Sequence, residues 1–152
     1  MITINIVCVG NLKEKFWKEA CEEYKKRKKK HCNLKIIEVD EKNMYELPQK
    51  ILTYEGKEIL GHLGSKNILL DIKGKALSSE EFASKLKELA NETSEITFVI
   101  GGSYGVSDEV KNAVNEKISF GKITYPHNLA RVILLEQLYR AFMINSGSKY
   151  HK

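Results

Sequence analysis

Continuous apolar runs alternate along the chain with segments in which apolar residues recur at helical spacing. The runs predict buried strands at residues 2–10, 33–40, 67–74 and 95–100. The helical spacing predicts helices after residue 13, at 46–63, after the capping box of Ser78 and Glu81, after Ser107 and at 128–145. Residues 117–127 form a short extended segment that is broken by Gly121. This order predicts a single α/β domain over residues 1–152, built on a parallel sheet with helices on both faces.

The composition excludes several classes of protein. Apolar residues make up 42% of the chain and charged residues 30%, which is typical of a globular fold. No run approaches the length of a membrane span, and the apolar start at residues 1–10 indicates a first strand and not a signal peptide. The cysteines, Cys8, Cys21 and Cys32, form no CxxC pair. We therefore expect a cytoplasmic protein with free thiols, no membrane association and no bound metal.

The positive charge of the chain is concentrated in one place. The net charge is +5, and the run KKRKKK at residues 25–30 alone contributes six positive charges. Two interpretations stay open. Cations are favourable at the C-terminus of a helix, so the run can be a solvated helix end. Lysine and arginine also neutralise phosphates, so it can be a surface that binds nucleic acid.

The segment ITFVIGGSYGV, residues 96–106, places Gly101 and Gly102 directly after the fourth predicted strand. Ligands of parallel sheets bind beyond the carboxyl ends of the strands, and glycine permits positive φ and close approach of the backbone. A tight turn is the alternative. The motif is neither a Walker loop nor the GxGxxG fingerprint, and no GxSxG elbow occurs. A glycine loop with little charge favours an adenosine-type ligand that is held by backbone groups and apolar side chains.

The segments FVIGGSYGVSDEV and ISFGKITYPHNLARVILLEQLYRAFMINSGSKYHK resemble the RlmH family of SPOUT methyltransferases. The resemblance covers the whole chain through VGNLKEKFWK, EGKEIL and LDIKGKALSSEEFA. It implies an α/β fold whose C-terminal part forms a trefoil knot. It also implies transfer of a methyl group from S-adenosylmethionine to N3 of a pseudouridine in large-subunit ribosomal RNA, within the ribosome. The working unit would be a homodimer.

The same resemblance implies site residues. The cofactor would be bound by Leu70, Asp71, Gly101, Gly102, Phe120, Gly121, Lys122, Ile123, Thr124 and Tyr125. RNA would be bound by Arg131, Arg140, Tyr150, His151 and Lys152. His127 and His151 are the candidate general bases. Alternatives stay open for three of these residues: the segment 126–128, which includes His127, can simply cap the last helix, and Arg131 and Arg140 can form ion pairs at a helix interface.

The last predicted helix is apolar on every side between Leu129 and Ile144, apart from Arg131, Glu136 and Arg140 and neighbouring polar positions. A helix of this kind must be buried on every side, whereas one sheet covers only one side. The pattern predicts an obligate homodimer with this helix at its centre. We expect glutamate at Leu135 and Leu138 to give an unfolded protein or an inactive monomer, depending on which of the two residues faces the partner. The sequence leaves open the form of the RNA substrate and whether the uridine must first be isomerised.

Overall fold

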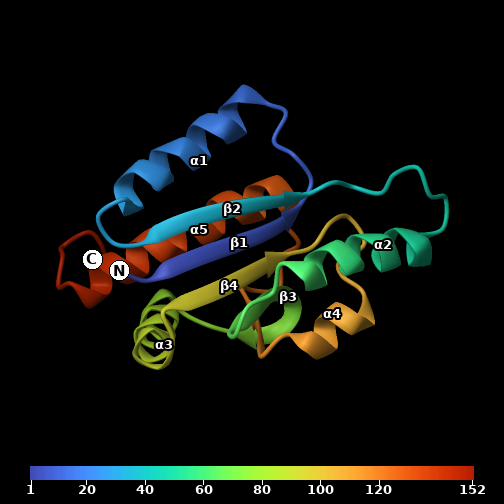
Figure 1. Cartoon of the computed structure of the whole chain (residues 1–152). Helices are drawn as coiled ribbons and strands as arrows, with labels where there is room; N and C mark the ends of the chain where they lie inside the picture. The colour runs from blue at the N-terminus through green and yellow to red at the C-terminus, as the bar shows by residue number, and fades with distance from the viewer.

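A computed structural model of the chain describes residues 1–152 (Figure 1). Five strands form one sheet in the order β2-β1-β4-β3-β5, and every neighbouring pair is parallel. The strands are β1 (Thr3–Val9), β2 (Asn33–Val39), β3 (Asn67–Ala76), β4 (Glu95–Ile100) and β5 (Glu116–Ser119). The helices are α1 (Lys15–Lys28), α2 (Pro48–Gly61), α3 (Ser79–Glu92), α4 (Asp108–Ala113) and α5 (His127–Asn145). The predicted parallel α/β sheet is confirmed.

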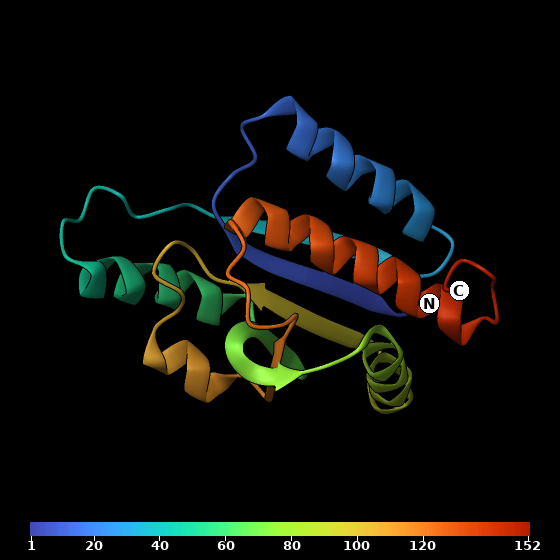
Figure 2. The same cartoon turned by 180° about the vertical axis from the view of Figure 1, so that it is seen from behind.

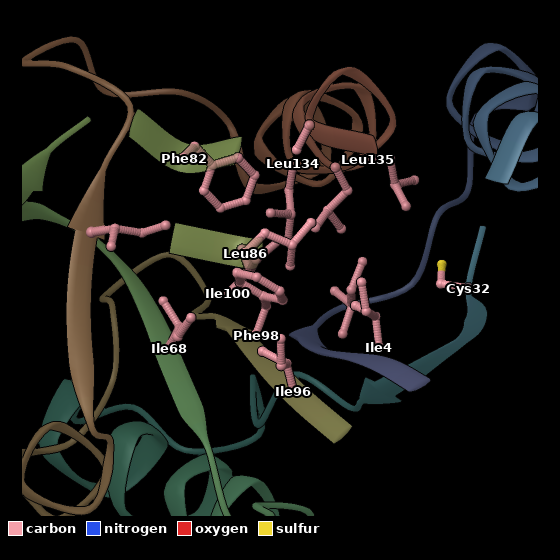
Figure 3. Packing of buried hydrophobic residues seen from close by; sticks show 14 of the residues in the cluster. Ile4, Cys32, Ile68, Phe82, Leu86, Ile96, Phe98, Ile100, Leu134 and Leu135 are labelled. Carbon is pink, nitrogen blue, oxygen red and sulfur yellow. The ribbon is translucent and has the colours of Figure 1, made fainter. Parts of the chain in front are cut away.

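The helices divide between the two faces of the sheet (Figures 1 and 2). The larger apolar core unites α1, α3 and α5 with one face, through residues such as Cys21, Phe82 and Leu134. Figure 3 shows side chains of α3 and α5 pointing at the sheet in this core. A smaller core joins α2 and α4 to the other face through Ile59 and Val110. No helix has the combination of length and hydropathy that a membrane span needs.

Local sequence signals account for the starts of α2 and α3. Ser78 caps α3: its hydroxyl accepts a hydrogen bond from the Glu81 amide at 3.1 Å, and the Glu81 carboxylate accepts one from the Ser78 amide at 2.9 Å. This is the predicted capping box. Helix α2 begins at Pro48 and not at residue 46, because proline at the first turn has no amide to leave unpaired.

Strand β3 wraps around β5. Ile118 of β5 pairs with Leu70 before a break in the register and with Lys75 after it. A Cβ at Gly74 would lie 2.6 Å from the carbonyl carbon of Lys117, so the wrapped loop touches the strand inside it. Residues 70–75 thus curve around the chain at Ile118. The trefoil knot that the resemblance implies stays a prediction, and this close wrapping is compatible with it.

Helix α5 lies on the sheet between α1 and α3 (Figure 2). Leu134, Leu135 and Leu138 have no exposed surface, and they belong to the core shared with the sheet. Glutamate at Leu135 or Leu138 would therefore disrupt the fold of the single chain. The expectation that one of Leu135 and Leu138 faces a partner subunit is wrong, because both lie in the core of the single chain. The other expected outcome, an unfolded protein, agrees with this burial.

Candidate active site

A cavity of about 870 Å³ opens at the carboxyl ends of β4 and β5 and at the break in the register of β3, beside the first turn of α5. Nine of the ten predicted cofactor residues line it: Leu70, Asp71, Gly101, Gly102, Phe120, Gly121, Ile123, Thr124 and Tyr125. Lys122 is exposed and does not line the cavity. Three segments that are far apart in the sequence therefore meet at one place, as ligand sites of parallel sheets do.

The cavity also contains residues that sequence reasoning missed. They are Leu69, Ile72, Lys73, Ile100, Ser103, Tyr104, Gly105, Val106, Lys111, Ile118, Ser119, Pro126 and Ala130. Ile72, Tyr104 and Ile123 are 49%, 57% and 70% exposed, so large apolar side chains surround the opening. Lys111 lies on α4, and no sequence motif points to it. Such exposed apolar groups beside a cavity favour a ligand or partner that covers them.

Gly101 and Gly102 form a tight turn. A Cβ at Gly101 would lie 2.6 Å from the Gly105 carbonyl oxygen, and one at Gly102 would lie 3.0 Å from a methyl of Val9. The Gly105 amide donates to the Gly102 carbonyl at 3.0 Å. Neither Gly101 nor Gly102 has a positive φ, so that part of the expectation is wrong. The absence of side chains here serves the close packing of the loop on itself and on β1, next to the cavity.

His127 stands at the rim of the cavity as the first residue of α5. Its Nε2 lies 3.6 Å from Oε1 of Glu41. The cap position of the helix is Pro126, and no side chain caps this end. The alternative that residues 126–128 cap the helix thus holds only for the position of Pro126, and the His127 side chain makes no capping hydrogen bond.

Arg131, one turn further along α5, is buried with 3% of its surface exposed. It donates to Glu38 at 2.8 Å and to the Gly10 carbonyl at 3.0 Å. Of the two alternatives for Arg131, the structure contains the ion pair. Both terminal nitrogens are engaged inside the protein, so Arg131 is not presented to RNA phosphates.

The C-terminal tail folds back over the end of α5. The Tyr150 hydroxyl donates to Glu136 at 3.1 Å, and Arg140 contacts the same carboxylate at 2.9 Å. His151 lies with Nδ1 3.0 Å from Arg140 and Nε2 2.5 Å from the Glu80 carboxylate. The hydrogen bond from His151 lowers the pKa of Glu80. Arg140 thus pairs within the tail cluster, while Lys152 is exposed.

The tail and the cavity lie at opposite ends of α5. The helix has 19 residues, which corresponds to about 27 Å. His151 therefore lies far from the cavity of its own chain, and His127 is the candidate base that lines it. Both chain termini lie at the tail end of α5 (Figures 1 and 2).

The basic run at residues 25–30 is not uniform. Lys25 pairs with Glu22 at 3.2 Å, and Arg27 pairs with Glu23 at 3.1 Å. Lys28 has no exposed surface, and burial lowers its pKa to about 7. The exposed members without an ion pair are Lys26, Lys29 and Lys30. A description of the whole run as one solvated surface is therefore wrong for Lys28.

The cysteines are buried free thiols. Burial raises the pKa of Cys8 to about 11 and raises those of Cys21 and Cys32 as well. Thiols of this kind are unreactive at neutral pH. No group of three or more His, Cys, Asp or Glu side chains is placed to hold a metal ion.

Comparison with known proteins decides between the classes that this geometry allows. Residues 2–151 match the family described as "Predicted SPOUT methyltransferase". The chain belongs to this family. It is 48% identical to "Ribosomal RNA large subunit methyltransferase H" of Lactobacillus acidophilus, over 99% of this chain and 100% of the relative. It is 45% identical to the protein of the same name from Caldicellulosiruptor saccharolyticus, over 98% and 99%.

Solved structures support the SPOUT fold. A methylase family protein of Haemophilus influenzae matches with a TM-score of 0.57 and 15% identity, over 98% of this chain and 70% of that one. A methyltransferase of Legionella pneumophila with bound S-adenosylmethionine matches with a TM-score of 0.50 and 11% identity, over 92% and 66%. The resemblance to a SPOUT methyltransferase is confirmed, and the protein is a methyltransferase.

Proposed function

We propose that this methyltransferase transfers a methyl group from S-adenosylmethionine to N3 of a pseudouridine in large-subunit ribosomal RNA. The observation that carries the proposal is full-length similarity to ribosomal RNA methyltransferases together with the cavity formed by the predicted segments. An RNA-binding protein without catalytic activity is the alternative. It would have no use for a cavity formed by the glycine loop and by residues 120–125.

The cavity fits the cofactor. Its volume of about 870 Å³ lies within the range of sites for small molecules. Backbone groups of the glycine loop line it, and Leu70 and Ile123 offer apolar surfaces on which an adenine can pack. When bound, the cofactor supplies a methyl group that its sulfonium already activates. The protein must then hold the target nitrogen in line with this methyl carbon and exclude water. We assign cofactor binding to the nine predicted residues that line the cavity.

We further propose that the protein works as a homodimer in the cytoplasm. The tail lies about 27 Å along α5 from the cavity of its own chain, so it cannot complete that cavity. A two-fold axis that crosses α5 would place the tail of one subunit at the cavity of the other. Tyr150 could then stack on a base, and His151 and Lys152 could add donors and charge. The half-buried outer side of α5, with Ile133 among its residues, would form part of the contact.

The test is mass mapping of methylated nucleotides in ribosomal RNA from cells with and without the gene. We expect one methylated pseudouridine of the large subunit to lose its methyl group, and the purified protein to restore it on ribosomes. Sedimentation at low micromolar concentration tests the dimer. Calorimetry with S-adenosylmethionine separates the enzyme from the RNA-binding alternative, because a protein that binds only RNA would give no heat of binding when S-adenosylmethionine is added. Unchanged methylation in cells without the gene would contradict the proposed function.

A further inference from the structure

Gly10, at the end of β1, makes room for two side chains of opposite chemical character. It has φ of +102°, and a Cβ there would lie 2.9 Å from Oε1 of Glu41 and 3.1 Å from Nε2 of His127. Any larger residue would separate the two groups. Glu41 lies in the connection after β2, and His127 lies in the first turn of α5. The fold thus brings a carboxylate and an imidazole together over a position that only glycine can occupy.

Hydrogen bonds around Glu41 and around the first turns of α5 hold the two residues of this pair in place. Oε2 of Glu41 accepts a hydrogen bond from the Asn43 side chain at 3.0 Å. The next amide in the chain, that of Lys42, donates at 3.1 Å to Glu55, which is 4% exposed. One turn after His127, Arg131 binds the Gly10 carbonyl and Glu38. The ends of β1 and β2 are therefore tied to the first turns of α5, which holds the backbone of His127 beside the cavity.

A carboxylate selects one tautomer of a neighbouring imidazole. With Nε2 facing Oε1 of Glu41, the proton of the neutral ring belongs on Nε2, and Nδ1 is left with a free lone pair. The present separation of 3.6 Å is longer than a hydrogen bond, and catalytic hydrogen bonds are often this long before substrate binds. His127 lines the cavity, and Nδ1 is the ring nitrogen that Glu41 leaves free for a group entering it.

We propose that Glu41 and Gly10 are positioning residues that present Nδ1 of His127 as the general base of the methyl transfer. The proposal rests on the proposed function. Nδ1 takes the proton from N3 of the target base, and the electron pair left on N3 forms the bond to the methyl carbon. The carbon–sulfur bond breaks with its electron pair remaining on sulfur. His127 leaves the step as an imidazolium that Glu41 stabilises, and it returns the proton to water.

The tautomer can be measured without any turnover. Nitrogen-15 chemical shifts distinguish the protonated from the unprotonated nitrogen of a neutral histidine ring, and spectra recorded at several alkaline pH values select the neutral form. A His127→Gln variant assigns the signal among the four histidines. We expect His127 to carry its proton on Nε2 in the unmodified protein, and the preference to weaken in Glu41→Gln. A proton on Nδ1 in the unmodified protein would overturn the proposal.

Kinetics on ribosomes test the role in the reaction. We expect His127→Ala to lower kcat by about a hundredfold or more and Glu41→Gln by about tenfold. The dissociation constant of S-adenosylmethionine and KM for the RNA should stay within about twofold of the unmodified protein, because neither residue is assigned to binding. Added imidazole should restore part of the rate of His127→Ala and none of that of Glu41→Gln. Glu58→Gln is the matched control: Glu58 pairs with Lys42 on the surface and should leave kcat unchanged.

A double-mutant cycle decides whether Glu41 acts through His127. In the His127→Ala background, Glu41→Gln should have no further effect on kcat. Additive losses, or full activity in His127→Ala, would contradict the proposal even if the unmodified protein methylates RNA. If the unmodified protein methylates no RNA, the proposed function fails, while the tautomer measurement still tests the pairing.

Discussion

Replacing Lys28 with methionine should stabilise the protein. Lys28 has no exposed surface, and its amine has no hydrogen-bond partner. Burial lowers its pKa from 10.5 to about 7, so the folded state opposes the charged form that the unfolded chain prefers. Methionine keeps the length of the side chain, fills the same space and removes the amine. The core around Lys28 then carries no ionisable group at that position.

The size of the effect follows from the pKa difference. A shift from 10.5 to about 7 corresponds to about 5 kcal/mol of unfolding free energy. This is an upper value, because relaxation and water entry reduce the cost of a buried charge. Between pH 7 and 10.5 the unfolded chain binds more protons than the folded one, so this cost shrinks as pH rises. We expect Lys28→Met to gain about 2 to 5 kcal/mol at pH 7 and less than about 1 kcal/mol near pH 10.

Urea unfolding of both proteins at several pH values between 6 and 10 provides the measurement. Burial raises the pKa of Cys8 to about 11, so ionisation of this thiol at high pH favours the unfolded state. The thiols therefore also change the unfolding free energy of each protein with pH. Both proteins contain these thiols, so the difference between their free energies isolates Lys28. Lys29→Met is the control, since Lys29 is exposed and should change stability little. A destabilised Lys28→Met variant, or a difference that does not vary with pH, would refute the reasoning.

Three further predictions concern the cavity, the tail and the basic run. Gly102→Val places its Cβ 3.0 Å from Val9, so the loop must shift. We expect the variant to fold and to bind S-adenosylmethionine at least about tenfold more weakly in calorimetry, and unchanged affinity would contradict this. Deleting residues 150–152 should spare cofactor binding and abolish methylation of ribosomes, whereas full activity would show that the tail is dispensable. Replacing the three exposed lysines of the basic run with glutamine should weaken RNA binding and flatten its salt dependence in filter-binding assays. An unchanged slope would identify the run as a solvated helix end.

The sequence predicted the central strands β1 and β4 well because they are buried on both faces and therefore read as continuous apolar runs. It also predicted the cavity residues, through the family resemblance: Gly101 and the segment from Phe120 follow β4 and β5, and Leu70 lies in β3 at the break in its register. The partnership of Glu41 and His127 could not be predicted. These residues lie far apart in the chain, and only the register of β1 against β2 and the start of α5 bring them together over Gly10.

The burial of Lys28 left a signal that the charge run hid. Lys28 is seven residues after Cys21 and four after Tyr24, so it continues the apolar face of α1. Charge composition assigns the residue to the surface, whereas helical spacing assigns it to the core, and the structure follows the spacing. Local spacing is the better guide here because the whole helix must turn one face to the sheet, whatever residue falls on that face.

Helix α5 shows how a correct inference from pattern can select the wrong residues. Apolar residues on every side predicted burial on every side, and residues 127–144 are all buried or half-buried in the single chain. The sheet, α1, α3 and the tail account for much of that burial. The periodicity of apolar residues shows that a helix is buried, but it does not show which neighbour buries each residue. The residues that test the dimer are therefore the half-buried ones on the outer side, such as Ile133, and not Leu135 or Leu138 in the core. Helix α5 carries His127 at one end and the contacts of the C-terminal tail at the other. Its length therefore sets the distance between the cavity and the tail of one chain, which a second subunit would have to bridge.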